Sequence, residues 1–305
     1  MTRFGIGIPQ VQPEPRADVA ALHRFLRRAE DLGYESAWVL EQPVGTARVL
    51  EPTAVLAHAA AVTSRMRLGT AVILLPLRVP VELAKTLATV DQLSGGRLIA
   101  GIALGAWKDR YPAFGLSAEG RVRRFEEAVQ LLKRLWTEPS VTLDGEFWKL
   151  EAAAVEPKPV QQPHPPLWFG GTAPAAVQRA ARLADGWIGA GSASTADFAG
   201  AHTVMREALA AERRDPAGFS VAKRVYVAVD EDRERARSRL RDWFQGFYGK
   251  PDLADRVAVV GSPDACVEGL AEVVRAGAQL IVLNPLFDQE RQAEMLAAEV
   301  IPALA

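Results

Sequence analysis

The chain has very little cysteine and very little histidine. Its only cysteine is Cys266, which excludes a disulfide within the chain and fits a reducing compartment, so we expect a cytoplasmic protein. The histidines, His23, His58, His164 and His202, show no spacing that places two on one helical face, and none has a cysteine partner. A metal site is therefore not expected.

An excess of charge of either sign is also lacking, and so are long apolar runs. Lysine and arginine number 36 against 37 aspartate and glutamate residues, for a formal net charge of -1. Nucleic-acid binding depends on a basic surface, so no polynucleotide partner is expected. No stretch of roughly 18 apolar residues occurs, and the first residues lack an apolar core behind a basic start. We therefore expect neither a membrane span nor a targeting segment.

Two glycine-containing motifs are missing as well. No Gly-x-Gly-x-x-Gly follows the first expected strand, where an open dinucleotide-binding sheet carries its phosphate turn. No Gly-x-Ser-x-Gly occurs either, so covalent hydrolase chemistry has no support.

The sequence does contain a regular alternation of short apolar stretches and helical patterns. The expected strands are Phe4–Ile8, Ser36–Leu40, Leu68–Leu75, Leu98–Ala103, Leu167–Phe169, Gly186–Ile188, Val221–Val229 and Leu280–Leu283. The expected helices are Ala17–Leu32, Pro52–Thr63, Val79–Leu93, Arg121–Trp136, Ala175–Ala184, Ala196–Ala211, Glu231–Phe247, Ala265–Ala276 and Glu290–Leu304. Eight strand and helix units over 305 residues predict a (β/α)8 TIM barrel in the α/β class.

The barrel is expected to form one domain over residues 1–305, with insertions near 107–120, 137–166 and 246–256. Two alternating runs around Asp144-Gly145 predict a hairpin within the second insertion. A doubly wound open sheet is the structural alternative, and the missing glycine motif argues against it.

One stretch points to a ligand at the carboxyl end of a strand. The turn Ser94-Gly95-Gly96 leads into the buried-strand pattern 98–103, which ends at Gly105-Ala106. Small residues at that end leave backbone exposed, so that a flat ligand can approach closely.

The ordered motifs along nearly the whole chain resemble the bacterial luciferase-like superfamily. The stretches that carry the resemblance are Leu68–Ile73, Asp91–Leu98, Gly105–Trp107, Arg121–Trp136, Trp168–Gly171, Ala184–Trp187, Gly261–Pro263 and Gly277-Ala278. Members of this superfamily use reduced FMN or the deazaflavin coenzyme F420 on a (β/α)8 barrel. The resemblance thus implies an oxidoreductase that transfers a hydride between F420 and a small organic substrate, with FMN as the alternative cofactor, and it implies a homodimer.

The resemblance also implies a cofactor site at the carboxyl ends of the strands. It places a non-prolyl cis peptide between Ala71 and Val72, against the middle ring of the cofactor. The residues expected around the cofactor are Trp38, Thr70, Ala71, Val72, Leu104, Gly105, Gly186 and Trp187, although a place in the core is the favoured interpretation of Trp187. Gly170, Gly171 and Thr172 precede a helix whose first amides can bind a phosphate. Trp107 is expected to line the substrate cavity.

Glu41-Gln42, after the second strand, departs from the family pattern. Luciferase-like relatives commonly carry an acidic residue followed by a proton-handling histidine here. The Gln42 carboxamide does not titrate, so it can orient a ligand but cannot act as a general acid or base. Glu41 is the candidate acid or base if burial raises its pKa toward neutrality, and otherwise it is a fixed, hydrogen-bonded element.

Four charged residues are expected to be structural. Lys223 and Arg224 lie in the first part of the seventh expected strand, which predicts a position on the stability face of the barrel. Asp91 and Arg97 flank the Ser-Gly-Gly turn and are expected to pair across it.

Two other functions stay open. One is an FMN-dependent monooxygenase, in which dioxygen reacts with the reduced cofactor. The other is a cofactor-binding barrel without turnover, which the missing histidine at Gln42 suggests. The loops, which determine the substrate, carry no recognisable signature of it.

Overall fold

Eight parallel strands form a closed ring in the computed structural model, which describes residues 2–12, 14–105 and 108–304. The ring contains β1 (Arg3–Gly7), β2 (Ser36–Val39), β3 (Arg67–Thr70), β5 (Leu98–Ala103), β8 (Leu167–Gly170), β9 (Gly186–Gly189), β10 (Ser220–Val229) and β12 (Leu280–Asn284). Because β10 pairs with both β9 and β12, the sheet has no open edge within the ring. The predicted (β/α)8 barrel is confirmed.

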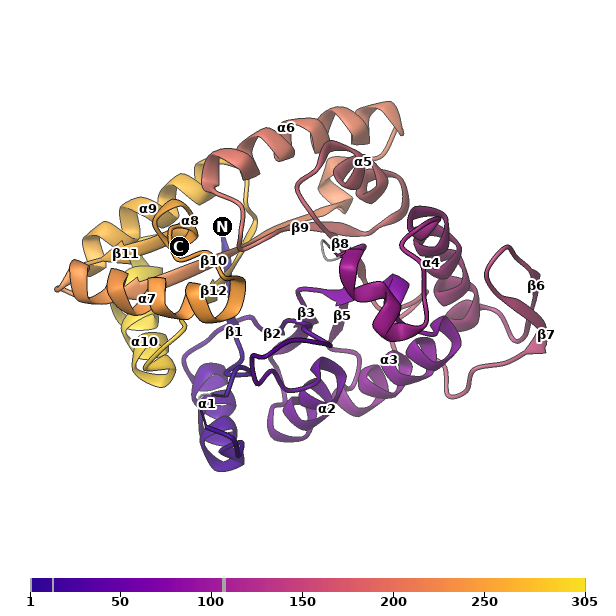
Figure 1. The fold of residues 1–305 in the computed structure, drawn as a ribbon, viewed down its shortest axis with the longest axis horizontal. Helices are drawn as coiled ribbons and strands as arrows, with labels where there is room; N and C mark the ends of the chain where they lie inside the picture. The colour runs from indigo at the N-terminus through magenta and orange to yellow at the C-terminus, as the bar shows by residue number, and fades with distance from the viewer. Residues whose placement is uncertain (1, 13, 106–107, 305) are drawn as a thin grey trace.

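Helices surround the strands on the outside (Figure 1). They are α1 (Val19–Asp31), α2 (Pro52–Val62), α3 (Pro80–Ser94), α4 (Arg121–Thr137), α5 (Pro174–Leu183), α6 (Thr195–Ala211), α7 (Arg233–Tyr248), α8 (Leu253–Val257), α9 (Pro263–Arg275) and α10 (Gln289–Met295). The start of α6 shows how sequence sets a boundary. Ser194 accepts a hydrogen bond from the Asp197 amide, and the Asp197 carboxylate accepts one from the Ser194 amide.

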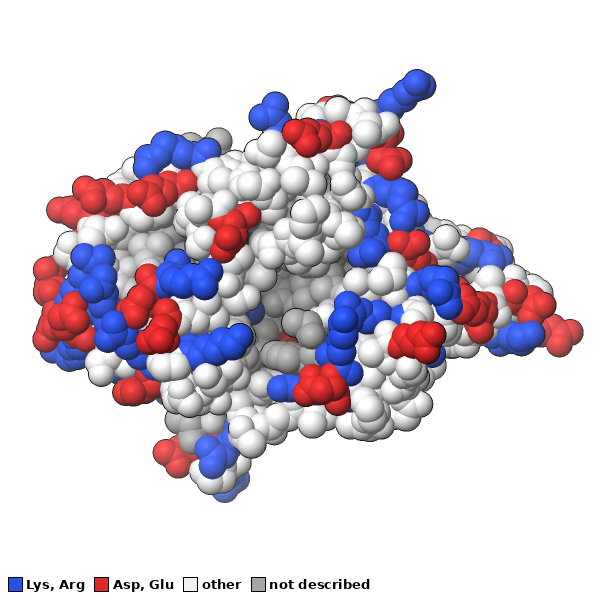
Figure 2. Space-filling view, turned by 45° about the horizontal axis from the view of Figure 1, so that its top comes forward, with Lys and Arg blue, Asp and Glu red and all other residues white. Residues whose placement is uncertain are grey.

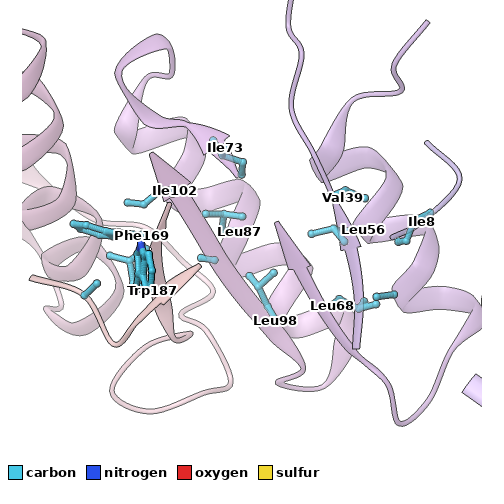
Figure 3. Close-up of a cluster of buried hydrophobic side chains, with 14 of the residues drawn as sticks. Ile8, Val39, Leu56, Leu68, Ile73, Leu87, Leu98, Ile102, Phe169 and Trp187 are labelled. Atoms are coloured by element: carbon cyan, nitrogen blue, oxygen red, sulfur yellow. The ribbon is translucent and has the colours of Figure 1, made fainter. Parts of the chain in front are cut away.

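The main hydrophobic core lies between the strands and the helices. Figure 3 shows part of it, where Leu56 of α2 lies near Val39 of β2 and Leu87 of α3 lies near Leu98 of β5. These side chains are almost fully buried, and burial of a leucine or phenylalanine contributes roughly 1.5–3 kcal/mol to folding.

A second cluster fills the inside of the barrel. Its buried members are Trp38, Ile99, Trp168, Ile188, Ala222, Leu280 and Val282. The Trp38 and Trp168 rings lie 5.4 Å apart between centroids, and Ala71 and Val72 pack against the cluster. The barrel is therefore a packed core, and a ligand has room only above it.

Several elements differ from the sequence expectation. The expected strand Leu68–Leu75 is interrupted at Ala71-Val72, after which β4 (Ile73–Leu74) pairs with β5. The expected last helix is α-helical only as far as Met295 and is followed by a π-helical turn over Leu296–Val300 and a 3-10 turn over Ile301–Ala303. Pro302, which has no amide hydrogen, lies in the last of these turns.

The second expected insertion contains the predicted hairpin. β6 (Val141–Asp144) and β7 (Lys149–Ala153) pair in antiparallel orientation around the expected turn. A further strand, β11 (Ala258–Gly261), pairs with β10 outside the ring and was not expected from the sequence. No helix in the described ranges is both long enough and apolar enough to cross a membrane.

Asp91 and Arg97 hold the lower rim of the barrel, although each uses other partners than the expected one. The buried Asp91 carboxylate accepts hydrogen bonds from the amides of Val160 and Gln161. Arg97 donates to backbone carbonyl oxygens, including that of Met66, at 2.8 Å. The expected structural role is supported, and the expected pairing across the turn is replaced by these bonds.

Candidate active site

Two neighbouring cavities lie at the carboxyl ends of the barrel strands. The first has a volume of about 430 Å³ and the second of about 410 Å³. They share Ala71, Val72, Ser192, Arg224 and Tyr248, so one continuous region of the surface serves both. Figure 2 shows the hollow in this region of the molecule, with charged side chains of both signs around it. In TIM-barrel enzymes this end of the strands carries the chemistry.

The floor of both cavities is formed by the Ala71-Val72 peptide, which is cis as the resemblance implied. Val72 lies against Gly170 so closely that a Cβ atom at residue 170 would be 2.8 Å from Val72 Cγ1. Glycine at 170 therefore allows β8 to approach the floor. Leu104 and Gly105 line the first cavity as well, as predicted.

The expected phosphate turn lines the same cavity. Gly171 has a φ of 132°, a conformation that side chains disfavour, and Thr172 follows it just before α5. Ala173 precedes the helix and supplies no side-chain cap, but Pro174 has no amide hydrogen, and the amides of Ala176 and Val177 donate to the Ala173 carbonyl oxygen. The glycine turn itself, rather than the start of α5, is therefore what this segment offers to an anion. The buried Trp187 donates a hydrogen bond from Nε1 to the Gly171 carbonyl oxygen at 2.6 Å. This bond holds the Gly171 turn in place from the side of the buried core.

Arg121, the first residue of α4, also lines the first cavity. Its Nη1 atom is buried and has no hydrogen-bond partner among the described residues. A guanidinium group with an unused donor in the cavity that contains the glycine turn adds positive charge to the expected phosphate site.

Glu41 lines the second cavity and is 5% exposed. Its carboxylate accepts a hydrogen bond from the Leu74 amide and a hydrogen bond from Arg78 Nε at 2.8 Å, and Arg78 Nη2 also contacts it. Burial raises the pKa of Glu41, while the Arg78 charge opposes the rise. Because both carboxylate oxygens are engaged, the geometry matches a fixed element that holds Leu74 and Arg78.

Gln42 is half-buried and lines neither cavity. Its Oε1 atom is buried without a hydrogen-bond partner in the described part of the chain, and its side chain lies against Gly45. A role for Gln42 in orienting a ligand stays a prediction.

Four other expected cofactor residues lie behind the cavity wall. Trp38 is inside the barrel beneath the floor, and Thr70 exchanges hydrogen bonds with the Gly101 backbone. Gly186 begins β9 at the opposite end of the strand, where it pairs with Ser220. Trp187 is fully buried and stacks on Phe198, with ring centroids 4.9 Å apart. The expected substrate residue Trp107 lies outside the described residues.

The position of Arg224 differs from the one predicted from the sequence. It was expected on the stability face, but it is 8% exposed and lines both cavities. The strand β10 is ten residues long, and its second half continues beyond the ring to pair with β11, so the middle of the strand is level with the mouth of the barrel. Arg224 donates to the Ala71 carbonyl oxygen at 3.3 Å and contacts the Tyr226 hydroxyl.

Lys223 faces the other side of the same strand. It is 2% exposed, and its Nζ atom donates to the carbonyl oxygens of Ala190 and Ala193, at 2.8 Å in the second case. Burial lowers the pKa of Lys223 to about 7, and the charge of Arg224 acts in the same direction. Lys223 thus holds the loop 190–193, which lines the first cavity. The structural role agrees with the sequence expectation, but the expected position on the stability face is wrong, because this loop follows β9 at the mouth of the barrel.

Sequence reasoning did not find Tyr226 and Tyr248. Tyr226 is two residues after Arg224 on β10, and the spacing of two places both side chains on one face of the strand. Arginine and tyrosine two residues apart in an otherwise apolar strand were a detectable signal. Tyr248 had no such signal, because only the fold brings the end of α7 to the cavity.

A comparison with family models gives one match over most of the chain. The model described as luciferase-like monooxygenase matches residues 2–254. The chain belongs to the luciferase-like monooxygenase family.

Named relatives within this family use two different cofactors. The chain is 33% identical over 310 residues to an F420-dependent glucose-6-phosphate dehydrogenase of Kineococcus radiotolerans, covering 92% of this chain and 91% of that enzyme. It is 27% identical over 246 residues to an FMNH(2)-dependent dimethylsulfone monooxygenase of Pseudomonas putida, covering 78% of this chain and 66% of that enzyme. The match spans only half the length of curated mycobacterial relatives.

Solved structures agree with the family assignment. The crystal structure of the monooxygenase RslO1 from Streptomyces bottropensis has a TM-score of 0.83 and 26% sequence identity. The superposition covers 99% of this chain and 100% of that one.

Proposed function

We propose that this protein is an oxidoreductase that transfers a hydride between coenzyme F420 and a small organic substrate. The observation that carries the proposal is the first cavity, which combines an apolar floor at Ala71-Val72 with a glycine turn before α5. The identity of 33% with an F420-dependent enzyme over 92% of the chain supports F420 ahead of FMN.

The residues present fit a planar cofactor with a phosphate. Gly170 leaves the floor open at a position where a Cβ atom would meet Val72. The glycine turn at Gly171 and the unused donor of Arg121 line the same cavity and suit a phosphate group. Arg224 adds a buried positive charge at the floor, which suits an electron-rich ring.

The chain's own residues would bind, orient and shield the reactants. Ala71 and Val72 support one face of the ring, and the turn at Gly171 holds the phosphate. Leu40, Leu74, Phe247 and Leu253 line the second cavity, and their apolar side chains limit water near the substrate. The hydride chemistry itself belongs to the cofactor. Holding donor and acceptor in one geometry is a main contribution of the protein to the rate.

An FMN-dependent monooxygenase is the second candidate. The similarity to a dimethylsulfone monooxygenase, at 27% identity over 78% of the chain, supports it. A barrel that binds a cofactor without turnover is less well supported, since these relatives are named as enzymes. A homodimer and a cytoplasmic location stay predictions.

Absorption titration of the purified protein with F420 and with FMN tests the proposal. We expect a saturable spectral change with F420 at lower concentration than with FMN, and anaerobic hydride transfer to or from a substrate panel. Tighter binding of FMN, together with oxygen-dependent formation of an oxygenated product, would favour the monooxygenase. Absence of binding of either cofactor would overturn both.

A further inference from the structure

Tyr248 occupies a distinctive place between the two cavities. It is the last residue of α7 and lines both of them, together with the floor residues Ala71 and Val72. Its hydroxyl oxygen lies 2.7 Å from the Tyr226 hydroxyl oxygen, and Tyr226 is in contact with Arg224 Nη2. A chain of hydrogen bonds thus runs from the buried Arg224 to a hydroxyl at the cavity wall.

The donors in this chain can be assigned from chemistry. A guanidinium only donates, so the Tyr226 oxygen accepts from Arg224. Burial raises the pKa of Tyr226 well above its usual value of 10, so this phenol keeps its single proton. The geometry allows either hydroxyl to donate, but the Tyr248 oxygen is the one acceptor that the described residues offer to the buried Tyr226 proton, so we assign Tyr226 as the donor to Tyr248. The Tyr248 proton is then left for a group in the cavity.

The surroundings hold the chain in place and favour this direction. The Arg224 guanidinium lies 4.9 Å from the centre of the Tyr226 ring, and no carboxylate is paired with it in the described ranges. The Tyr248 ring packs against Phe244 and Phe247, with centroid distances of 5.4 and 4.9 Å. Hydrogen bonds in series strengthen one another, so the Tyr248 hydroxyl is a better donor than an isolated phenol.

Other polar groups in or near the second cavity are less suited to proton donation. Both carboxylate oxygens of Glu41 already accept hydrogen bonds, from Leu74 and Arg78. Gln42 does not titrate and lines neither cavity. Lys250 is the main rival donor because it also lines the second cavity, although its side chain is exposed.

We propose that Tyr248 is the catalytic proton donor to the oxygen of a small aliphatic carbonyl substrate bound in the second cavity, with Tyr226 and Arg224 as positioning residues. The apolar walls at Leu40, Leu74 and Leu253 suit the aliphatic part of such a substrate. This inference rests on the proposed hydride transfer. The carbonyl carbon gains the hydride that reduced F420 supplies, and the oxygen gains the Tyr248 proton as the carbonyl double bond becomes single. The product is the alcohol, and Tyr248 then regains a proton from water. Oxidation of the alcohol follows the same steps in reverse.

Binding of isobutyramide, an unreactive carbonyl analogue, tests the donor without turnover. Titration calorimetry on the protein with and without oxidised F420 should show binding that is about tenfold weaker in Tyr248→Phe, since one hydrogen bond to a carbonyl is lost. The distant Tyr34→Phe, whose hydroxyl bonds Ala293, should bind like the wild type, and Lys250→Met, in the cavity wall, should lose less affinity than Tyr248→Phe. Equal binding by Tyr248→Phe, loss in Lys250→Met instead, or no binding by the wild type would each overturn the proposal.

Kinetics separate this inference from the proposed function. With reduced F420 and a panel of small ketones, Tyr248→Phe should lower kcat by about 10²–10⁴-fold while the Kd for F420 stays unchanged. Tyr226→Phe removes the hydroxyl between Arg224 and Tyr248 but leaves the direct interaction of Arg224 with Tyr248, so it should give a smaller loss in kcat with little change in KM. If F420 does not bind but the amide result holds, hydride transfer and the catalytic role of Tyr248 both fail, and only its hydrogen bond to a carbonyl oxygen stands. If the wild type reduces ketones and Tyr248→Phe keeps its kcat, the donor assignment fails alone.

Discussion

The Trp187 indole nitrogen lies 2.6 Å from the Gly171 carbonyl oxygen and donates a hydrogen bond to it. Although Trp187 is fully buried behind the cavity wall, this bond connects it to the turn expected to hold a phosphate. A side chain in the core thereby controls the backbone geometry of the site.

We expect Trp187→Phe to weaken F420 binding about 3- to 10-fold, because one hydrogen bond that orients the turn is lost. Absorption titration measures the change. Trp136→Phe is the matched control, since the Trp136 indole donates to the Ala84 carbonyl oxygen at 3.0 Å and Trp136 lines neither cavity. Equal weakening in both variants would show that general loosening of the core, and not the turn, is responsible.

Gly170→Ala should impair the site by steric contact. The new Cβ atom would be 2.8 Å from Val72 Cγ1, so either the floor or β8 must shift. We expect a loss of roughly 1–3 kcal/mol in the free energy of unfolding and at least tenfold weaker F420 binding. Gly200→Ala on α6 is the control, because nothing lies within 4 Å of the added atom. Unchanged F420 binding in Gly170→Ala would contradict this view of the floor.

Glu41→Gln should destabilise the fold by about 2–3 kcal/mol. Removing one partner of a buried ion pair costs about 3–5 kcal/mol. The smaller figure is expected here because the Arg78 side chain is 29% exposed and keeps Glu51 at 2.9 Å. Urea unfolding measures the effect. Glu146→Gln, which breaks the exposed pair with Arg123, should cost less than about 1 kcal/mol. Similar losses in the free energy of unfolding of the two variants would show that the buried Glu41–Arg78 pair contributes no more than an exposed pair.

Because Lys223 is buried, we expect the free energy of unfolding to depend on pH in the alkaline range. Its pKa is 10.5 in the unfolded chain and about 7 in the folded protein, so between these values the unfolded chain binds more protons. The free energy of unfolding should therefore rise with pH from about 7 to 10.5, with a slope that approaches about 1.4 kcal/mol per pH unit. Below pH 7 the cost of the buried charge is fully present.

Lys223→Met should remove this rise, and urea unfolding at several pH values compares it with the wild type. Lys149→Met changes an exposed lysine of the hairpin and should keep the wild-type slope. A wild-type slope that persists in Lys223→Met would assign the effect to another group.

Much of the fold follows from local sequence patterns. The apolar stretches and helix periods of residues 4–283 predicted all eight ring strands, because each strand is buried on both faces and bounded by turn residues. β11 was missed because Ala258–Gly261 is short and pairs only with an extension of β10, which no local pattern reveals. The break at Ala71-Val72 came from the resemblance alone.

The site was predictable where backbone geometry defines it and not where side chains from distant elements meet. Gly170 and Gly171 were found because two glycines shortly before a helix are typical of a backbone that an anion approaches closely. Arg224 was misplaced because the sequence does not show how far β10 extends beyond its neighbours. Tyr248 was missed because a helix end reaches the cavity only through the packing of α7.

The length of β10 has a consequence for protein engineering. Lys223 on one face holds the wall of the first cavity, and Arg224 and Tyr226 on the other hold the wall of the second. A mutation that displaces this strand would disturb cofactor and substrate selectivity together. Libraries aimed at new substrates should therefore leave β10 intact and vary Phe247, Lys250 and Leu253. These residues reach the second cavity from the end of α7, the α7–α8 connection and the start of α8, and they are absent from the lining of the first cavity.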